Sequence, residues 1–181
     1  MYTKYSEQVK SVLAKTDLEN FNLAINKIIF ALENRTHIYL FGNGGSSATA
    51  SHFVVDWRKN VSQKLGYYPN VTSLTDNTPL MTAIANDIDY SEIFSEQLQN
   101  CAKSGELALA ISGSGNSRNV INGVLMANQL GLETISLTGF DGGEVGRLSN
   151  LNCRVNSNDI KIVEDLHSIF GHAVVSGILH L

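Results

Sequence analysis

Four ionisable side chains on two predicted helices could do acid–base chemistry or bind a metal ion. His52 and Asp56 are four residues apart in a stretch without Gly or Pro, so one helix face carries both. Glu164 and His172 are eight residues apart near the C-terminus, which leaves them roughly on one side of a second helix. Two histidines and two carboxylates could hold Zn²⁺ or a similar divalent ion in a four-coordinate site. They could equally supply a histidine–carboxylate pair for proton transfer, and the spacing of His52 and Asp56 alone is also typical of an ordinary surface pair.

Three glycine-rich turns could bind an anion. They occupy residues 42–47 (GNGGSS), 112–117 (SGSGNS) and 138–143 (TGFDGG), and each follows a short apolar run. Glycine lets the backbone approach a ligand closely, and the N–H groups that begin a helix favour a phosphate. The first turn lacks the lysine of a Walker loop and does not match the Gly-x-Gly-x-x-Gly dinucleotide fingerprint. Taken singly, each turn could also be a plain strand-to-helix connection.

Serine hydroxyls add to the phosphate interpretation of the second turn. Ser112, Ser114 and Ser117, with Ser46 of the first turn, offer neutral donors that could surround a phosphate without Lys or Arg. Such donors suit a phosphate monoester that is held as a handle. Transfer of a phosphoryl group would need Mg²⁺-binding carboxylates and a cationic clamp, and the sequence offers no such set. For Ser117, capping of the following helix is an equally compatible role.

The elements that position these residues alternate between strand and helix. Strands are predicted at residues 38–41, 70–74, 106–111, 133–137 and 151–155. Helices are predicted within 3–34 (two), from the first glycine turn to about residue 59, and at 78–86, 91–102, 119–130, 143–148 and 160–181. This alternation with short connections predicts an α/β fold with a doubly wound, five-stranded parallel sheet. All three glycine turns follow strands and therefore meet at the carboxyl edge of the sheet, where ligands of such folds bind.

An N-terminal helical arm precedes the first strand. The two apolar helices within residues 1–35 have no glycine turn of their own, and the α/β core at 36–181 completes a single predicted domain. Such an arm often packs on another subunit. It could equally add a layer to the core of its own chain.

Composition excludes several classes of protein. The 181 residues are 43% hydrophobic and 17% charged, which is typical of a globular chain with a sizeable core. The 13 basic and 17 acidic side chains give a net charge of −4 without a basic run, so nucleic acid is not an expected partner. No signal peptide or membrane-spanning run is predicted, and Cys101 and Cys153 are expected to be reduced thiols of a cytoplasmic protein.

The ordered set of motifs resembles the sugar isomerase (SIS) domain superfamily, and within it the phosphoheptose isomerase (sedoheptulose-7-phosphate isomerase) family. The similarity runs through nearly the whole chain. The Ser-x-Ser-Gly-Asn-Ser turn is typical of the superfamily. The complete ordered set of motifs, together with His52 and His172, is a more specific signature. The matching segments are residues 42–46, His52-Phe53, 85–87 (Ala-Asn-Asp), 111–117, 137–139, 141–143, Glu164, His167 and His172.

The resemblance implies a homotetrameric enzyme with sites between subunits. Its reaction would convert sedoheptulose 7-phosphate to D-glycero-D-manno-heptose 7-phosphate, a precursor of lipopolysaccharide, capsule or S-layer glycans, through an enediol(ate) and without a nucleotide or redox cofactor. The implied acid–base pair is Asp56 and His172. One zinc ion per subunit would be bound by His52, Asp56, Glu164 and His172. The implied substrate contacts are Asn43, Gly44, Gly45, Ser46, Asp56, Asn86, Asp87, Ser112, Gly113, Ser114, Ser117 and Glu164.

Three positions depart from the pattern of this family. Asp56 stands where the family has its catalytic Glu, Glu164 where it has Gln, and Asn60 where typical members have Arg. The shorter Asp56 carboxylate has to be brought closer by the backbone or by a metal ion, and Glu164 adds a negative charge. Either the divalent-ion cage becomes firmer or Glu164 takes part of the base role. A paralogous branch that acts on a related sugar phosphate fits these changes.

The alternative is a non-catalytic SIS tetramer. Relatives of the isomerase include a replication-initiation regulator that binds an initiator protein, and other SIS modules sense sugar phosphates. Such a protein would keep the glycine turns but need not keep the ionisable set. Because His52, Asp56 and His172 are all present, the sequence favours the enzyme.

Overall fold

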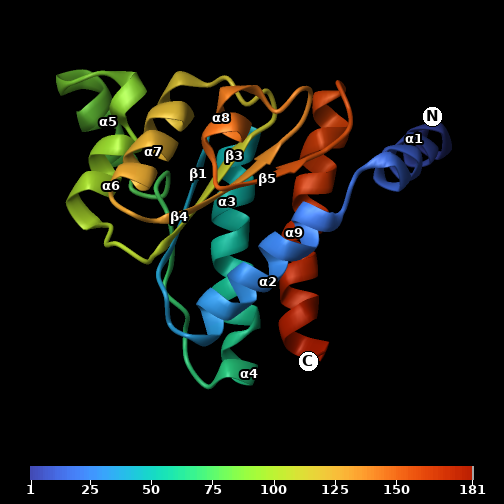
Figure 1. Ribbon diagram of the computed structural model, residues 1–181, viewed down its shortest axis with the longest axis horizontal. Helices are drawn as coiled ribbons and strands as arrows, with labels where there is room; N and C mark the ends of the chain where they lie inside the picture. The colour runs from blue at the N-terminus through green and yellow to red at the C-terminus, as the bar shows by residue number, and fades with distance from the viewer. Residues whose placement is uncertain (181) are drawn as a thin grey trace.

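A parallel sheet of five strands forms the centre of the computed structural model, which describes residues 1–180 (Figure 1). The strand order is β2-β1-β3-β4-β5, and all neighbouring strands are parallel. The strands are β1 (Ile38–Gly42), β2 (Val71–Ser73), β3 (Leu107–Ser112), β4 (Glu133–Thr138) and β5 (Leu151–Arg154). The predicted α/β fold with five parallel strands is confirmed.

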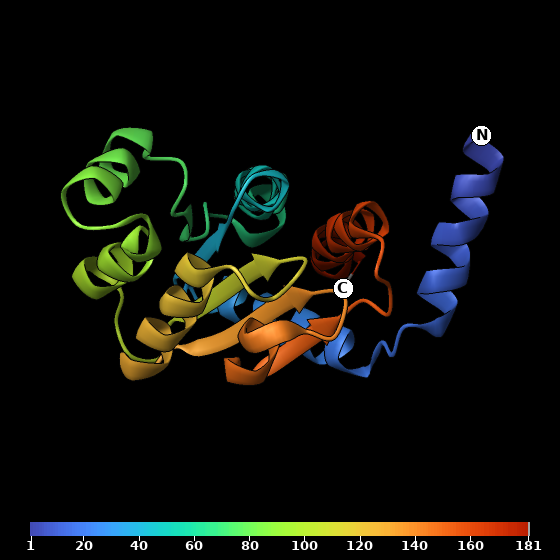
Figure 2. The same ribbon diagram turned by 90° about the horizontal axis from the view of Figure 1, so that it is seen from above.

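Helices cover both faces of the sheet, and each face has its own hydrophobic core. α2, α3 and α9 supply one core, and α6, α7 and α8 supply the other. Figure 2 shows α3 and α9 on one side of the sheet and α7 and α8 on the opposite side. The helices and helical turns are α1 (Tyr2–Lys15), α2 (Glu19–Glu33), α3 (Gly45–Val55), η1 (Asp56–Asn60), α4 (Ser62–Leu65), α5 (Thr78–Asp87), η2 (Tyr90–Glu92), α6 (Ser95–Cys101), α7 (Arg118–Gln129), α8 (Gly143–Leu148) and α9 (Ile160–His180).

Strand β1 shows how the sequence builds both cores at once. Side chains alternate between the two faces of a strand. Ile38 and Leu40 join the core under α2, α3 and α9, whereas Tyr39 and Phe41 join the core under α6 and α7. All five residues of β1 are buried, as expected for a central strand of a parallel sheet that is covered on both faces.

The helix predicted from the first glycine turn to about residue 59 contains an irregular turn. α3 ends at Val55, and the π-helical turn η1 continues from Asp56 to Asn60. A π-turn inserts one extra residue into a helix and is frequent at functional sites. The hydrophobic pattern alone does not distinguish this turn from regular α-helix.

Polar side chains divide the helix predicted at residues 91–102 into η2 and α6. The carboxylate of Asp89 accepts a hydrogen bond of 2.7 Å from the backbone N–H of Ser91. The hydroxyl of Ser95 donates a bond of 3.1 Å to the carbonyl of Glu92. Such side chains offer the backbone groups partners outside a continuous helix, and the helix therefore starts later than predicted.

α1 stands apart from the sheet at one end of the molecule (Figure 2). All of its residues are at least partly exposed. It lies against α9, Val9 and Val12 pack on the first core, and the hydroxyl of Tyr5 donates a bond of 2.7 Å to Asp165 of α9. This bond raises the pKa of Tyr5 to about 12. The arm is thus joined to its own chain along α9 and still exposes apolar surface at Leu13.

α9 is the long helix that closes the first core. Within residues 1–180 it is the one helix that is long and apolar enough to cross a membrane by length and composition, whereas the sequence predicted a long helix here but no membrane-spanning run. In the structure 44% of its most apolar 18-residue stretch is buried. Val163, Leu166 and Phe170 pack in the core, as in a core helix of an α/β protein. Residue 181, the end of the predicted last helix, lies outside the described residues.

Candidate active site

The carboxyl ends of β1 and β3 lie side by side at the centre of the sheet. In the strand order 2-1-3-4-5, the chain turns to opposite sides of the sheet after these two strands. Ligands of doubly wound folds bind in the crevice at this switch point. The turns at residues 42–47 and 112–117 lie there, and the turn at 138–143 follows the neighbouring β4. The prediction that the three glycine turns share one edge is therefore confirmed.

The third turn supports the second turn. The amide of Gly139 donates to the carbonyl of Gly113, and the amide of Val145 donates to the carbonyl of Gly115, each at 2.8 Å. Gly115 has a φ of +67°, and a Cβ there would overlap the carbonyl of Gly142. These contacts assign the third turn to bracing the serine turn rather than to the ligand.

A hollow of 190 Å³ opens between the first two turns and α9. It brings together most of the predicted phosphate-binding residues. Ser46 and Ser112 are buried in its wall. Ser117 is the N-cap of α7, yet its side chain makes no capping hydrogen bond, so its hydroxyl is available to a ligand. The lining residues are Asn43, Ser46, Ile111, Ser112, Gly113, Ser114, Ser117, Ile160 and Glu164.

The carboxamide of Asn43 is held by two residues that sequence reasoning missed. Asn43 and Asn119 exchange two side-chain hydrogen bonds of 2.8 Å each, and Asn119 is buried. The hydroxyl of Tyr90 donates a third bond of 3.2 Å to Asn43. The partners come from α7 and η2, and no spacing in the sequence indicates that they meet. Their effect is to fix the orientation of Asn43 at the rim of the hollow.

Glu164 lies against the beginning of α3. A Cβ placed on Gly45 would come within 2.8 Å of its Oε1. The preceding Gly44 has a φ of +53°, a conformation that L side chains rarely adopt. The helix N-terminus favours a negative charge, which is consistent with a carboxylate at this place. Glu164 thus forms part of the wall of the serine hollow.

His52, Asp56 and His172 converge at the other end of the same helix pair. The Nε2 atoms of the two histidines are 3.2 Å apart. Oδ2 of Asp56 is 3.3 Å from Nε2 of His52 and 3.6 Å from Nε2 of His172. Asp56 is only 7% exposed, and both imidazoles are open to solvent. Within residues 1–180 these three form the one group of potential metal ligands, and Glu164 does not belong to it.

The donor set fits a zinc ion. Two imidazole nitrogens and one carboxylate oxygen are the ligands that Zn²⁺ prefers in catalytic sites. With zinc–ligand bonds of about 2.0–2.1 Å, tetrahedral geometry separates the ligand atoms by about 3.4 Å. The three observed separations of 3.2, 3.3 and 3.6 Å lie close to this value. The same geometry also suits a proton shared between the carboxylate and one imidazole.

Packing between α3 and α9 sets the distance between the two histidines. Each site residue is next in sequence to a buried anchor, and the anchors contact each other. The rings of Phe53 and Trp57 stack with centroids 4.9 Å apart. A Cβ on Gly171 would overlap the ring of Phe53, so only glycine lets α9 come this close. Close approach of the two helices therefore brings His52 and His172 together.

Asn86 and Asp87 lie at the end of α5, outside both clusters. Both are exposed, and the amide of Asn86 donates a bond of 2.8 Å to the carboxylate of Asp87. α5 packs beside η2, whose Tyr90 reaches Asn43. Their contact with substrate remains a prediction.

His167, which the sequence indicated only as part of the family pattern, is a core residue. It is 1% exposed, and its Nε2 lies 3.2 Å from the carbonyl of Thr138, while Nδ1 has no partner. Burial lowers its pKa to about 4. His167 is therefore neutral at pH 7 and ties α9 to the end of β4.

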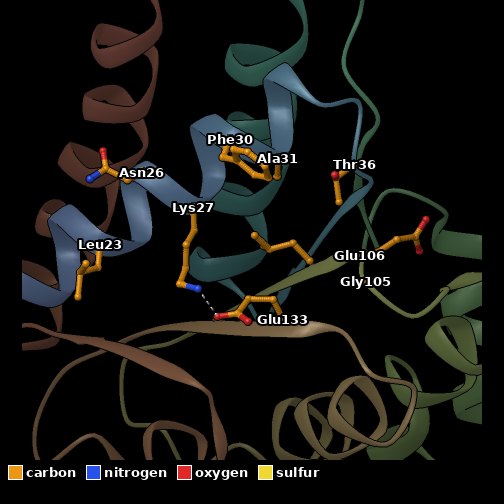
Figure 3. A pocket seen from close by; sticks show the side chains of 10 residues that line it. Leu23, Asn26, Lys27, Phe30, Ala31, Thr36, Gly105, Glu106 and Glu133 are labelled. Atoms are coloured by element: carbon orange, nitrogen blue, oxygen red, sulfur yellow. Dashed lines mark ion pairs between the residues drawn. The ribbon is translucent and has the colours of Figure 1, made fainter.

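Another hollow, of 410 Å³, lies at the opposite edge of the sheet (Figure 3). Its wall includes Phe30 and Ala31 of α2 and the residues that begin β3 and β4, among them Leu107 and Glu133. Lys27 and Glu133 form an ion pair of 3.0 Å across it. Because it faces the amino ends of the strands, none of the predicted site residues lines it.

Comparison with protein families and curated proteins identifies relatives along the chain. The SIS domain family matches residues 1–139. The phosphoheptose isomerase of Aliarcobacter butzleri is 36% identical over 173 residues, which cover 96% of this chain and 90% of that protein. A probable phosphoheptose isomerase of Thermoplasma acidophilum is 34% identical and covers 94% of this chain and 93% of its own length.

Solved structures show the same similarity. The phosphoheptose isomerase of Neisseria gonorrhoeae superposes with a TM-score of 0.88 at 28% identity, over 99% of this chain and 96% of that one. The phosphoheptose isomerase of Francisella tularensis gives a TM-score of 0.87 at 26% identity, with coverage of 99% and 97%. The likeness includes the helical arm as well as the sheet.

Proposed function

The chain belongs to the SIS domain family, and from this membership and its site we propose that it is a phosphoheptose isomerase. The reaction is the interconversion of sedoheptulose 7-phosphate and D-glycero-D-manno-heptose 7-phosphate. The observation that carries the proposal is that the serine hollow and the ionisable group are built on the same pair of helices. α3 and α9 contribute Ser46 and Glu164 to the serine hollow, and α3, its continuation η1 and α9 contribute His52, Asp56 and His172 to the ionisable group.

The two clusters divide the work of an aldose–ketose isomerase. The hydroxyls of Ser112, Ser114 and Ser117 hold the phosphate as a handle, as neutral donors can do for a group that does not react. Asp56 removes a proton from C1 of the ketose, which leaves an enediol(ate), and His172 returns a proton to C2; a hydroxyl proton moves from O1 to O2 in the same conversion, which completes the aldose. The reverse direction uses the same groups in opposite roles.

We further propose that each subunit binds one zinc ion through His52, Asp56 and His172. An ion held there would polarise the substrate oxygens and stabilise negative charge on them. The prediction that Glu164 is a fourth ligand would require its carboxylate to leave Gly45. We therefore assign Glu164 to the substrate.

A homotetramer in the cytoplasm that serves glycan synthesis completes the proposal, with residues 1–181 as a single SIS domain. Exposed apolar side chains support association. Phe30 on α2 is 66% exposed, Ile169 on α9 is 43% exposed, and the arm α1 adds Leu13. In a tetramer these side chains would be covered by other subunits.

The test is incubation of the purified protein with sedoheptulose 7-phosphate and measurement of the aldose formed. Asp56→Asn and His172→Ala are each expected to lower kcat by about 10²- to 10⁴-fold, the usual contribution of a general acid or base. Glu33→Gln, which changes an exposed carboxylate at the end of α2, is the matched control and retains activity.

Two outcomes contradict the proposal. Turnover by Asp56→Asn at the wild-type rate would remove Asp56 from the mechanism. No turnover by the wild-type protein, together with capture of a specific protein partner, would favour the non-catalytic SIS regulator.

A further inference from the structure

The two carboxylate oxygens of Asp56 have different partners. Oδ2 faces Nε2 of His52 and Nε2 of His172. Oδ1 accepts a hydrogen bond of 2.8 Å from the side-chain amide of Asn60. Because Asp56 is 7% exposed, little water is available to replace that donor. A buried carboxylate oxygen without a donor is costly, so the bond to Asn60 has a strong influence on the rotation of the carboxylate.

The π-turn η1 fixes both ends of this bond. Asp56 and Asn60 are its first and last residues. Between them Trp57 is fully buried, and its indole Nε1 donates a bond of 3.1 Å to the carbonyl of Gly171. Val61 follows the turn and is also fully buried. The backbone that carries Asp56 and Asn60 is thus anchored on both sides.

Asn60 is itself exposed and belongs to no core. The one side-chain hydrogen bond that it makes in residues 1–180 goes to Asp56. An exposed amide at the end of a helical turn contributes little to folding by its own burial. Its contact is therefore better explained by its effect on Asp56 than by packing.

We propose that Asn60 is a positioning residue that holds the Asp56 carboxylate so that Oδ2 alone faces the two histidines. Without the amide the carboxylate rotates about its Cβ–Cγ bond. The oxygen then leaves the point on which the two imidazole nitrogens converge. The kinetic part of this inference rests on the proposed isomerase function, whereas the geometric part does not.

The experiment compares Asn60→Leu, Asn60→Gln and Lys59→Ala. Asn60→Leu keeps a similar volume without a donor, Asn60→Gln keeps the donor, and Lys59→Ala changes the exposed neighbour on the same turn as a control. We expect Asn60→Leu to lower kcat for sedoheptulose 7-phosphate and the affinity of the metal-free protein for Zn²⁺, each by about 10- to 100-fold, with KM within about twofold. Asn60→Gln and Lys59→Ala are expected to keep kcat and the affinity for Zn²⁺ within about threefold of wild type, because both variants keep an amide donor for Oδ1 of Asp56.

Crystal structures of the variants test the geometry independently of turnover. In Asn60→Leu, Oδ2 of Asp56 is expected to lie farther from both histidine Nε2 atoms than in the wild type. An unchanged carboxylate in that variant, or an equal loss in Asn60→Leu and Asn60→Gln, overturns the proposal. If the wild type does not turn over sedoheptulose 7-phosphate, the isomerase proposal fails, and the carboxylate orientation still decides the role of Asn60.

Discussion

The indole of Trp57 donates a hydrogen bond to the carbonyl of Gly171, the residue immediately before His172. Trp57 itself follows Asp56. The bond therefore joins the backbones of two site residues through their nearest neighbours. α3 and α9 are held in register at the point where the ionisable group forms.

Gly171→Ala is expected to disturb this register. The added methyl group would overlap the Phe53 ring, and overpacking of this kind typically costs about 1–3 kcal/mol of unfolding free energy. Denaturant unfolding measures the loss, and a Zn²⁺ titration of the same variant should show weaker binding. Gly177→Ala is the control on the same helix, since its methyl group would meet only the terminal methyl group of Ile29, at 2.7 Å, and not a rigid ring. Equal costs at the two positions would contradict a special role for Gly171.

Ser117→Ala is expected to weaken substrate binding without a loss of stability. The Ser117 side chain makes no capping bond, so its removal should raise KM for a sugar phosphate several-fold and leave the unfolding free energy within about 0.5 kcal/mol. Asn77→Ala is the matched comparison, because Asn77 accepts a bond of 3.2 Å from Leu80 as the N-cap of α5. Its loss should cost about 1 kcal/mol without a change in KM. A stability loss of the same size in Ser117→Ala would mean that Ser117 is a cap.

Glu164→Gln is expected to tighten the binding of phosphate. Glu164 lines the hollow with the serines, and its carboxylate is a like charge to the bound anion. Removing the charge should lower the Kd for inorganic phosphate by about 3- to 10-fold at low ionic strength, and high salt should reduce the difference. Glu144→Gln, at an exposed carboxylate of α8, is the control. The zinc content of Glu164→Gln should equal that of wild type, and loss of zinc would instead make Glu164 a ligand.

His167 is expected to make stability depend on pH in the acidic range. Burial lowers its pKa from 6.5 to about 4, so at pH 5 the unfolded chain binds a proton that the folded chain excludes. The free energy of unfolding that depends on neutral His167 is therefore fully present above pH 6.5. It decreases as the pH falls and levels off below pH 4. At pH 5 the loss should be about 2 kcal/mol, as the linkage relation gives for this shift.

Urea unfolding of wild type, His167→Gln and His180→Gln at pH 7 and pH 5 measures this dependence. His167→Gln should lose part of the pH dependence, and His180→Gln, at the exposed end of α9, should keep it. The same slope in all three proteins would assign the acid sensitivity to other groups.

The sequence predicted the fold and the serine hollow well because both depend on local patterns. Short apolar runs that end in glycine turns determine where strands stop, and parallel topology then brings those ends to one edge. The hollow around Ser112 and Ser114 follows from this rule. The meeting of His52, Asp56 and His172 was foreseen as a possibility from helical spacing, and packing of α3 on α9 made it definite.

Contacts that depend on three-dimensional detail could not be predicted. The Asn43–Asn119 pair joins residues 76 positions apart, and neither residue type requires such a partner. The π-turn at Asp56 leaves no periodic signature in five residues. Glu164 was grouped with the histidines because helical spacing does not specify how far along a helix two side chains can still meet, and two helical turns separate it from His172.

The bonds from Gly139 and Val145 to the serine turn have a consequence for how substrate reaches the hollow. They make the wall at residues 112–117 part of the sheet edge, with little freedom to move. The opposite wall consists of Ile160, which is exposed, and Glu164, which is half-buried, near the start of α9. Any adjustment of the hollow to a bound sugar phosphate is therefore expected on the side of α9, from the side chains of Ile160 and Glu164, and not from the serine turn.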